Sequence, residues 1–427
     1  MIKQYTYNEI HIDDIFSRME EKNEIADVVA EIIATVRKKG DKALREYSLR
    51  FDGADLEKME VSAEEIQEAY EAVAKEFIFI LEEAAEHIRG YHEKQKRTDL
   101  MYMPRDGVIL GQKITPLDKV GLYVPGGTAN YPSTVLMNGI PAKIAGVKEV
   151  FMVTPAKGGK INPEVLAAAK IAGVDRIFKI GGAQAIAALA YGTETIPRVD
   201  KIVGPGNAFV AEAKKQVFGK VSIDMIAGPS EILVIADGQS DAAVVAADLL
   251  SQAEHDTMAS AVLVTDSKAL AEAVSACLEE QIPLLPRKEI ARKSIDINGK
   301  IILAESIQEA IEIANQIAPE HLELCVDHPF EYLGDIRHAG SIFLGRYAPE
   351  ALGDYFSGTN HTLPTGGSAR FASPLSVDDF IKKSSFTHYT KDALAKEADK
   401  INAFAQREGL AAHGKSAMIR FEREAKK

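Results

Sequence analysis

Apolar runs alternate with alanine-rich helical segments through the middle of the chain. From Lys119 onward, short runs with strand character are separated by segments of helical periodicity, and the runs read KVGLYVPGG, EVFMVTP, DRIFKIGG, KIVGPG and SIDMIAGPSEILVIAD. Alternation at this spacing is typical of βαβ units, which build a parallel sheet covered on both faces. We therefore predict a parallel sheet with right-handed connections and with ligands at the carboxyl ends of its strands.

The same alternation returns further along the chain. Four more segments have strand composition, with helical segments between most of them: 260–266, 300–306, 321–327 and 339–345. The predicted fold class is therefore α/β, with two Rossmann-like parallel-sheet lobes, a helical N-terminal region and a small helical C-terminal tail domain. The expected parts are an arm over 1–20, a first α/β lobe made of 21–122 and 232–374, a second lobe over 123–231, and a tail over 375–427.

Helical periodicity dominates the residues before the first sheet. A helical pattern runs from Ile25 to about Phe51 and is broken at Gly40, and Ser62-Ala-Glu-Glu65 has the form of a capping box that opens a longer helix. The tail is also helical and highly charged. Because it has too few apolar positions for a core of its own, we expect it to pack on another surface.

Composition narrows the class of protein. At 427 residues, with 46% hydrophobic and 26% charged residues, the chain has the profile of a globular protein with two or more lobes. Its net charge of −13 argues against a nucleic-acid binder. Cys277 and Cys325 lack the spacing of a disulfide framework or a cysteine-rich zinc module. The first residues lack the apolar segment of a signal peptide, and no apolar run is long enough to span a membrane, so we expect a cytoplasmic protein.

Three strand ends are rich in glycine: Tyr123-Val-Pro-Gly-Gly127, Gly181-Gly-Ala-Gln184 and Gly204-Pro-Gly-Asn207. Small residues before a helix let the backbone approach a phosphate, which the helix N-terminus also favours. None completes the GxGxxG fingerprint, and each alone is more simply a tight turn. Because all three lie along one predicted sheet edge, together they indicate a nucleotide site.

Candidate metal ligands are scattered along the chain. In DLLSQAEHD, Gln252 and His255 lie three apart and share one helix face, although a histidine near a helix C-terminus is also favoured by the dipole alone. Asp354 occurs in a loop dense in glycine and polar residues, and His413 occurs in REGLAAH. These four residues together would form a nitrogen and oxygen set suited to Zn²⁺, and Mn²⁺ or Co²⁺ could occupy the same set.

Glu320 and His321 stand together in APEHLEL, at the start of a predicted strand. Neighbours within a strand point to opposite faces, whereas in a loop entering the strand both could serve as a general acid and base. A charged loop end is the simpler interpretation of this pair alone.

Eight motifs occur in one order along the chain: GLYVPGG, YPSTVLMN, GGAQAIAALAYGT, VGPGN, AGPSE, SQAEHD, APEHLEL and GDYFSGTNHTLPT. Together they resemble the histidinol dehydrogenase family, from about Pro104 to His388 and again in the EGLAAH segment. The resemblance implies a homodimeric enzyme of histidine biosynthesis that oxidises L-histidinol to L-histidine through L-histidinaldehyde in two NAD⁺-dependent steps. It also implies that 123–231 is the NAD-binding lobe, that the first lobe carries the metal and catalytic residues, and that the tail contributes to the partner subunit's site.

The resemblance also assigns roles to individual residues. The implied zinc ligands are Gln252, His255, Asp354 and His413, and the implied proton acceptors are Glu320 and His321. The implied substrate contacts are Ser230, Gln252, His255, His321, Asp354, His361, Glu408 and His413. The implied NAD contacts are Tyr123, Gln184 and Asn207. Neither cysteine has a basic neighbour in sequence, so we expect no covalent thiohemiacetal.

Other functions remain open on the residues alone. A zinc hydrolase could use the same metal set with Glu320 activating water, and the glycine loops would then be structural. A related dehydrogenase could act on another amino alcohol or a sulfonated diol. A metal-dependent binding protein without turnover is a third alternative.

Overall fold

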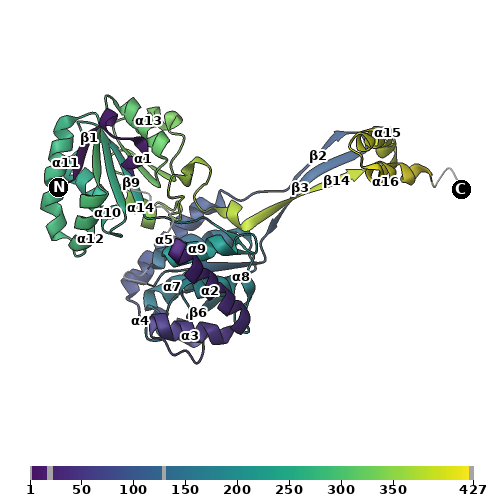
Figure 1. The fold of residues 1–427 in the computed structure, drawn as a ribbon, viewed down its shortest axis with the longest axis horizontal. Helices are drawn as coiled ribbons and strands as arrows, with labels where there is room; N and C mark the ends of the chain where they lie inside the picture. Colours follow the sequence, from purple (N-terminus) through teal and green to yellow (C-terminus); the bar gives the residue numbers. More distant parts are fainter. Residues whose placement is uncertain (1, 17–22, 127–130, 423–427) are drawn as a thin grey trace. The chain divides into compact units, whose positions relative to one another are not determined.

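The computed structural model describes residues 2–16, 23–126 and 131–422 (Figure 1). The chain forms two compact units. The first unit comprises Met1–Gln95 and Leu117–Phe380, and the second comprises Lys96–Pro116 and Ile381–Lys427. The first unit contains two parallel sheets, which confirms the α/β class predicted from the alternation.

One sheet of the first unit, sheet B, has five parallel strands in the order β6-β5-β4-β7-β8. Its strands are β4 (Lys119–Tyr123), β5 (Glu149–Val153), β6 (Arg176–Phe178), β7 (Lys201–Val203) and β8 (Ser222–Ile223). The helices after its strands are α6 (Pro132–Ala145), α7 (Pro163–Ala172), α8 (Gly182–Tyr191) and α9 (Ala208–Val217). Along β5, Val150 and Met152 enter the core on one face, whereas Phe151 and Val153 enter the core on the other. Each such buried side chain contributes about 1.5–3 kcal/mol.

The N-terminal helices cover sheet B. They are α2 (Asn23–Lys39), α3 (Asp41–Asp52), α4 (Ala63–Ala72) and α5 (Lys75–Glu93). Helix α2 packs on α8 and α9, whereas α4 and α5 pack on α7 and α6. The expected grouping of 21–122 with 232–374 is therefore wrong, because the apolar faces of these helices are buried on the alanine-rich helices of the other sheet. The capping box at Ser62 is present, but the long helix predicted after it is interrupted between α4 and α5.

The other sheet of the first unit, sheet A, has six parallel strands in the order β1-β11-β10-β9-β12-β13. They are β1 (Lys3–Thr6), β9 (Glu231–Ala236), β10 (Ser260–Thr265), β11 (Lys300–Leu303), β12 (His321–Cys325) and β13 (Ser341–Leu344). Helices α10 (Ala242–Ala253), α11 (Lys268–Gln281) and α12 (Lys288–Ile297) cover one face, and α1 (Ile12–Ile15) and α13 (Ile307–Ile317) cover the other (Figure 1). A short helix, α14 (Glu350–Tyr355), follows β13.

The expected N-terminal arm contains an edge strand of sheet A. Strand β1 pairs with β11 in parallel, from Lys3 opposite Lys300 to Thr6 opposite Leu303. The expected arm is therefore part of sheet A over this segment, because its main-chain groups complete the sheet edge. Residues 17–20 of the expected arm lie outside the described residues.

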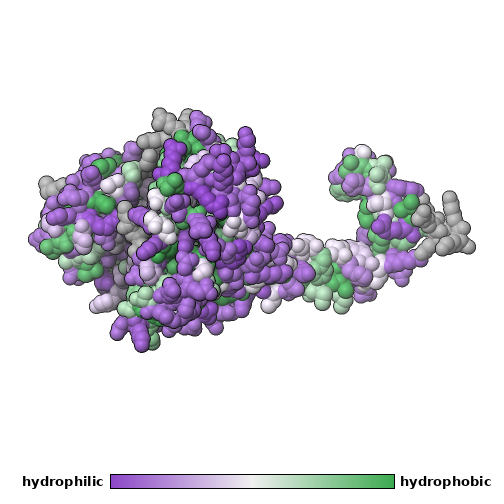
Figure 2. All heavy atoms as spheres, turned by 90° about the horizontal axis from the view of Figure 1, so that it is seen from below, coloured by the Kyte–Doolittle hydropathy of each residue, from purple (hydrophilic) through white to green (hydrophobic). Residues whose placement is uncertain are grey.

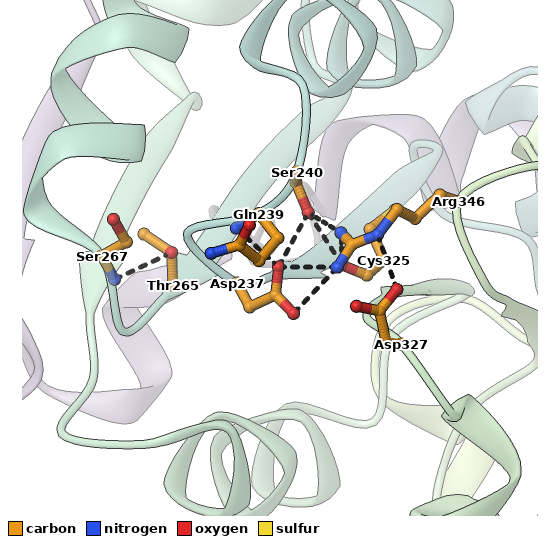
Figure 3. A network of polar contacts seen from close by, with 8 residues as sticks. All are labelled: Asp237, Gln239, Ser240, Thr265, Ser267, Cys325, Asp327 and Arg346. Atoms are coloured by element: carbon orange, nitrogen blue, oxygen red, sulfur yellow. Dashed lines mark hydrogen bonds and ion pairs between the residues drawn. The ribbon is translucent and has the colours of Figure 1, made fainter.

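The carboxyl edge of sheet A is closed by an arginine network (Figure 3). Arg346 donates to both carboxylate oxygens of Asp237 at 2.9 and 3.0 Å and to the Cys325 carbonyl at 2.7 Å. Asp237 follows β9 and Cys325 ends β12, which are the neighbouring strands at which the strand order reverses. An open α/β sheet usually binds its ligand in this crevice. In sheet A the side chains of Arg346, Asp237 and Ser240 meet at this crevice.

The second unit combines an antiparallel sheet with two helices. Its strands, in the order β14-β3-β2, are β14 (Ile381–Tyr389), β3 (Val108–Pro116) and β2 (Leu100–Arg105), and its helices are α15 (Lys391–Arg407) and α16 (Ala411–Glu422). The predicted helical tail of 375–427 is thus only partly right, because β14 pairs with residues from the N-terminal half. This unit exposes large apolar side chains, among which are Leu100, Met101, Tyr102, Met103 and Phe404 (Figure 2).

Short 3-10 helices occupy several connections: η1 (Tyr7–Glu9), η2 (Ile282–Leu284), η3 (Pro329–Glu331), η4 (Leu333–Asp335), η5 (Ser368–Arg370) and η6 (Val377–Phe380). Within the described ranges, no helix combines the length and the apolar content that crossing a bilayer requires.

Candidate active site

Glu320 and His321 are anchored to the main chain of a neighbouring strand. The Glu231 N–H donates to Glu320 Oε2 at 2.9 Å, and His321 Nδ1 lies 2.9 Å from the Glu231 carbonyl oxygen. Since a carbonyl can only accept, Nδ1 carries the proton and Nε2 is left as the basic nitrogen. Glu320 precedes β12 rather than lying within it, so the two neighbours reach the same residue, Glu231, instead of pointing to opposite faces.

The charges around this pair alter its proton affinity. Burial raises the pKa of Glu320 to about 8. Burial acts to lower the pKa of His321, but the neighbouring carboxyls, Glu320 first, outweigh it and the pKa is raised. His321 Nε2 lies 3.6 Å from Glu350 Oε1. These carboxyls therefore stabilise the imidazolium form of His321, which forms when Nε2 accepts a proton.

Helix α10 brings Gln252 and His255 to the same edge. It is capped by Asp241, whose side chain accepts the Ala243 N–H at 2.8 Å, and it connects two parallel strands. Such a helix returns to the amino edge of the sheet, so its last turn lies near the start of β9 and β12. Ser230, directly before β9, lies at this edge as well.

Gln252 is buried, and among the residues that the structure describes neither of its polar side-chain atoms has a hydrogen-bond partner. The amide lies beside the Glu350 carboxyl and acts to lower its pKa, but the two side chains do not meet hydrogen-bond geometry. A buried amide without partners costs about 1–3 kcal/mol. This arrangement indicates that a ligand satisfies Gln252.

Helix α14 supplies two carboxylates. Glu350 begins the helix and Asp354 lies one turn later, and both can present an oxygen within 4.8 Å of each other and of a His321 nitrogen. Burial acts to raise the pKa of Asp354, but His361 beside it outweighs burial and the pKa is lowered. Glu350 was not among the residues predicted from the sequence. Its position four residues before Asp354, on one helix face, is the signal that could have identified it.

The loop that carries His361 is held by the helices of sheet B. His361 Nδ1 lies 3.3 Å from Asp354 Oδ1. On either side of it, Asn360 donates to the Met137 carbonyl at 2.6 Å and the Thr362 hydroxyl donates to Asn138 Oδ1 at 2.9 Å. Because these neighbours are buried and hydrogen-bonded to helix α6, His361 is fixed beside Asp354.

A cavity of about 560 Å³ opens at this site. His255, Asp354 and Arg287 are among its polar lining residues, and apolar side chains of α5 and α6 line it as well. Burial lowers the pKa of His255, although Asp354 opposes this effect. A neutral imidazole in such a position is a suitable metal ligand. The expected grouping of His255 with Gln252 and Asp354 as nitrogen and oxygen ligands of one divalent cation stays a prediction.

The expected cofactor residues lie at the carboxyl edge of sheet B. The Tyr123 hydroxyl accepts the Gly182 N–H at 3.1 Å, and burial raises the pKa of Tyr123 to about 12. Gln184 is also buried, in the first turn of α8. Asn207 is exposed and caps α9, since its Oδ1 accepts the Phe209 and Val210 N–H groups, both at 3.1 Å. Its amide NH₂ group is thereby left for other partners.

A second cavity, of about 290 Å³, lies at the ends of β4 and β5. Lys157 and Lys160 line it together with Gly126. Small residues and two cations at this edge fit a phosphate-bearing cofactor. Gly127, the last residue of the first glycine loop, lies outside the described residues.

Glu408 and His413 belong to the second unit. Glu408 caps the C-terminal end of α15 and His413 lies in the first turn of α16, and both are exposed there. Their expected place in the site stays a prediction.

Comparison with known proteins places this geometry in a family. A sequence model of the histidinol dehydrogenase family matches residues 16–421. The chain is 57% identical over 396 residues to a histidinol dehydrogenase of Bacillus cereus, covering 93% of this chain and 92% of that protein. It is 55% identical over 401 residues to a histidinol dehydrogenase of Listeria monocytogenes, covering 94% of each. The crystal structure of histidinol dehydrogenase from Elizabethkingia anophelis superposes with a TM-score of 0.94 at 39% identity, covering 99% of each chain. The chain therefore belongs to the histidinol dehydrogenase family and is an enzyme of that family.

Proposed function

We propose that this enzyme oxidises L-histidinol to L-histidine through L-histidinaldehyde, as the closing steps of histidine biosynthesis. In the balanced reaction, one histidinol, one water and two NAD⁺ give one histidine carboxylate, two NADH and three protons. The observation that carries the proposal is the Glu320–His321 pair, anchored on Glu231 beside the unpaired amide of Gln252. The family assignment supports it.

Gln252, His255 and Asp354 would hold a zinc ion, together with the partner subunit's His413. The unpaired polar atoms of Gln252 and the mixed nitrogen and oxygen donors support this assignment. When bound, the metal supplies a positive template for an amine and an imidazole, both of which histidinol carries. Ser230, His361 and Glu408 are the further residues that we propose to contact the substrate.

His321 is the proposed base for the alcohol. Its Nδ1 donates to the Glu231 carbonyl, so Nε2 can accept the hydroxyl proton. The nearby carboxyls then stabilise the imidazolium. NAD⁺, when bound at Tyr123, Gln184 and Asn207, supplies the hydride acceptor for each oxidation.

Glu320 is the proposed base for the hydration of the aldehyde. Because its pKa is about 8, its carboxyl holds a proton for much of the time at neutral pH. The carboxylate that accepts a proton from water becomes more abundant as the pH rises. The second oxidation should therefore be favoured at mildly alkaline pH.

We also propose that two chains form a homodimer in which each tail completes the other subunit's site. The support is the exposed apolar surface of the second unit, together with the exposed position of Glu408 and His413 on it. A unit with this much apolar surface is better explained by a partner than by solvent.

The purified enzyme should be incubated with limiting L-histidinol and excess NAD⁺. We expect two NADH per histidinol and loss of activity after dialysis against a chelator, with recovery on adding Zn²⁺. One NADH per histidinol would contradict the two-step reaction alone. No NADH at all, or hydrolysis that needs no NAD⁺, would support a zinc hydrolase instead, and faster turnover of another amino alcohol would change the substrate.

A further inference from the structure

An ion pair lies in the interior of the first unit, beneath the third glycine loop. Lys214 on α9 contacts Asp224, which follows β8, and the two side chains are 2% and 1% exposed. Removing each charge from water costs several kcal/mol. Well-packed apolar residues in the same place often stabilise a protein as much as a buried ion pair does. Stability alone is therefore a poor explanation for this pair.

Both charges of the pair bind the same residue of the loop. Asp224 Oδ2 accepts the Gly204 N–H at 2.7 Å, and Lys214 Nζ donates to the Gly204 carbonyl at 3.0 Å. Asp224 Oδ1 also accepts the Met225 N–H at 2.6 Å. The ion pair thus holds both main-chain polar groups of one glycine.

Gly204 has a conformation that needs this support. Its φ is +112°, and a Cβ atom placed on it would lie 2.1 Å from the carbonyl oxygen of Tyr123. The end of β7 therefore lies directly against the end of β4. This is the point of sheet B where the strand order reverses and where an open α/β sheet binds its ligand.

The loop leads directly to Asn207, the exposed cap of α9. Its conformation sets where the Asn207 amide and the first N–H groups of α9 point. A misplacement of about 1 Å in bound groups can lower a reaction rate by about 100-fold. The ion pair, through Gly204, therefore determines the geometry of this edge.

We propose that Lys214 and Asp224 are positioning residues for the cofactor: their ion pair holds the Gly204–Asn207 loop in the conformation that binds NAD⁺. This inference rests on the proposed function, because NAD⁺ binding at this edge is itself a proposal. Neither side chain touches the cofactor, and both act through the main chain of Gly204.

The test is direct titration of the metal-loaded enzyme with NAD⁺, without substrate. Lys214→Met with Asp224→Leu removes both charges together, so no uncompensated buried charge remains. We expect the Kd and the KM for NAD⁺ to rise by about tenfold or more. The KM for histidinol, the zinc content and the far-ultraviolet circular dichroism should stay as in the wild type.

Lys201→Met is the matched control. Lys201 is 8% exposed, pairs with Asp379 at 2.8 Å and begins β7, at the opposite end of the strand that Gly204 follows. This substitution should lower the denaturation midpoint but leave the Kd for NAD⁺ unchanged. Equal weakening of NAD⁺ binding in both variants would reduce the Lys214–Asp224 pair to a general stabilising role and overturn the proposal.

A folded double variant with wild-type NAD⁺ affinity would also overturn it. If the double variant does not fold, Asp224→Asn carries the test, because it keeps an acceptor for Gly204 but removes the charge that holds Lys214. We expect severalfold weaker NAD⁺ binding in that variant, and unchanged binding would contradict the proposal. A wild-type enzyme that forms no NADH would instead remove the proposed function, so the two failures are distinguishable.

Discussion

At the scale of single residues, the same arrangement occurs twice: two side chains bind both main-chain polar groups of one residue. Glu320 and His321 bind the N–H and the carbonyl of Glu231, and Asp224 and Lys214 bind those of Gly204. Hydrogen bonds that involve charged groups are worth about 1.5–3 kcal/mol, so such contacts hold a local geometry firmly. For His321, the contact also determines which ring nitrogen is basic.

Replacing His321 by Asn should lower kcat by roughly 10²–10⁴-fold, because proton transfer in the transition state contributes about that much. Zinc content and NAD⁺ affinity should be unchanged. NADH formation and metal analysis on the same sample test this prediction. His388→Asn, at an exposed position on β14, is the control, and loss of zinc from the His321 variant would contradict the role as a base.

Replacing Glu320 by Gln should remove a pH dependence of the second oxidation. The wild-type rate of histidinaldehyde oxidation should rise as the pH passes about 8, since the carboxylate form of Glu320 then predominates. The variant has no such group to titrate, so its slower rate should show no rise in that range. Stopped-flow measurement from about pH 7 to about pH 9 gives the comparison. The same rise in both enzymes would assign it to another group.

At the scale of elements, a polar layer between α10, β12 and α14 supports the site. Glu323 lies two residues after His321 on β12, and its Oε1 accepts the Glu350 N–H at 2.6 Å. Asp248, one turn before Gln252 on α10, faces the same carboxyl. Burial raises the pKa of both Asp248 and Glu323. The hydrogen bond to Glu323 thereby holds the first turn of α14, which carries Glu350 and leads to Asp354.

This layer should make stability depend on pH. The pKa values of these carboxyls are higher in the folded state than in the unfolded chain, so the folded state binds more protons. The free energy of unfolding should therefore fall as the pH rises from about 4, the ordinary carboxyl pKa, to the raised values.

Glu323→Gln should give a shallower decline in the denaturation midpoint over that range, measured in urea at a series of pH values. Glu312→Gln serves as the control, because Glu312 is an exposed glutamate on α13 that pairs with Arg337. A wild-type midpoint that increases with pH, or equal slopes in the wild type and the Glu323 variant, would argue against a protonated buried pair.

At the scale of the whole molecule, the division into two units bears on function. The first unit contains Glu320, His321, Gln252, His255 and Asp354, whereas Glu408 and His413 belong to the second. If the tail serves the partner subunit, each site depends on two chains. In a closed two-fold dimer, both sites are then built in the same way.

Hybrid dimers of His321→Asn and His413→Asn chains test this arrangement. In a mixed dimer, one site carries both changes and the other carries neither. Equal mixing should therefore restore about a quarter of the wild-type activity, since half of the dimers are mixed and half of their sites are intact. Activity that stays at the level of the separate variants, despite proven subunit exchange, would place His413 in its own chain's site.

Local patterns in the sequence were sufficient for the elements and for the family. Strand–helix alternation predicted two parallel sheets, and the capping box at Ser62 and the break at Gly40 are both present. These features depend on periodicity and on contacts within a few residues, which sequence spacing encodes directly. Eight ordered motifs identified the family for a similar reason, since each is a short run of residues.

Tertiary structure decided what packs on what and which edge holds the site. An amphipathic pattern shows that a helix has a buried face but not which surface covers it, so only the structure shows that α2, α4 and α5 pack on the helices of sheet B. Gln252 and the base candidates lie toward the amino edge of sheet A, because α10 ends there and Glu320 directly precedes β12. Glu350, Lys214 and Asp224 gained their roles only through contacts with residues 10 to 30 positions away, such as Gly204 and Glu323. Such contacts depend on how strands and helices pack in space, and hydrophobic periodicity along one chain does not specify that packing.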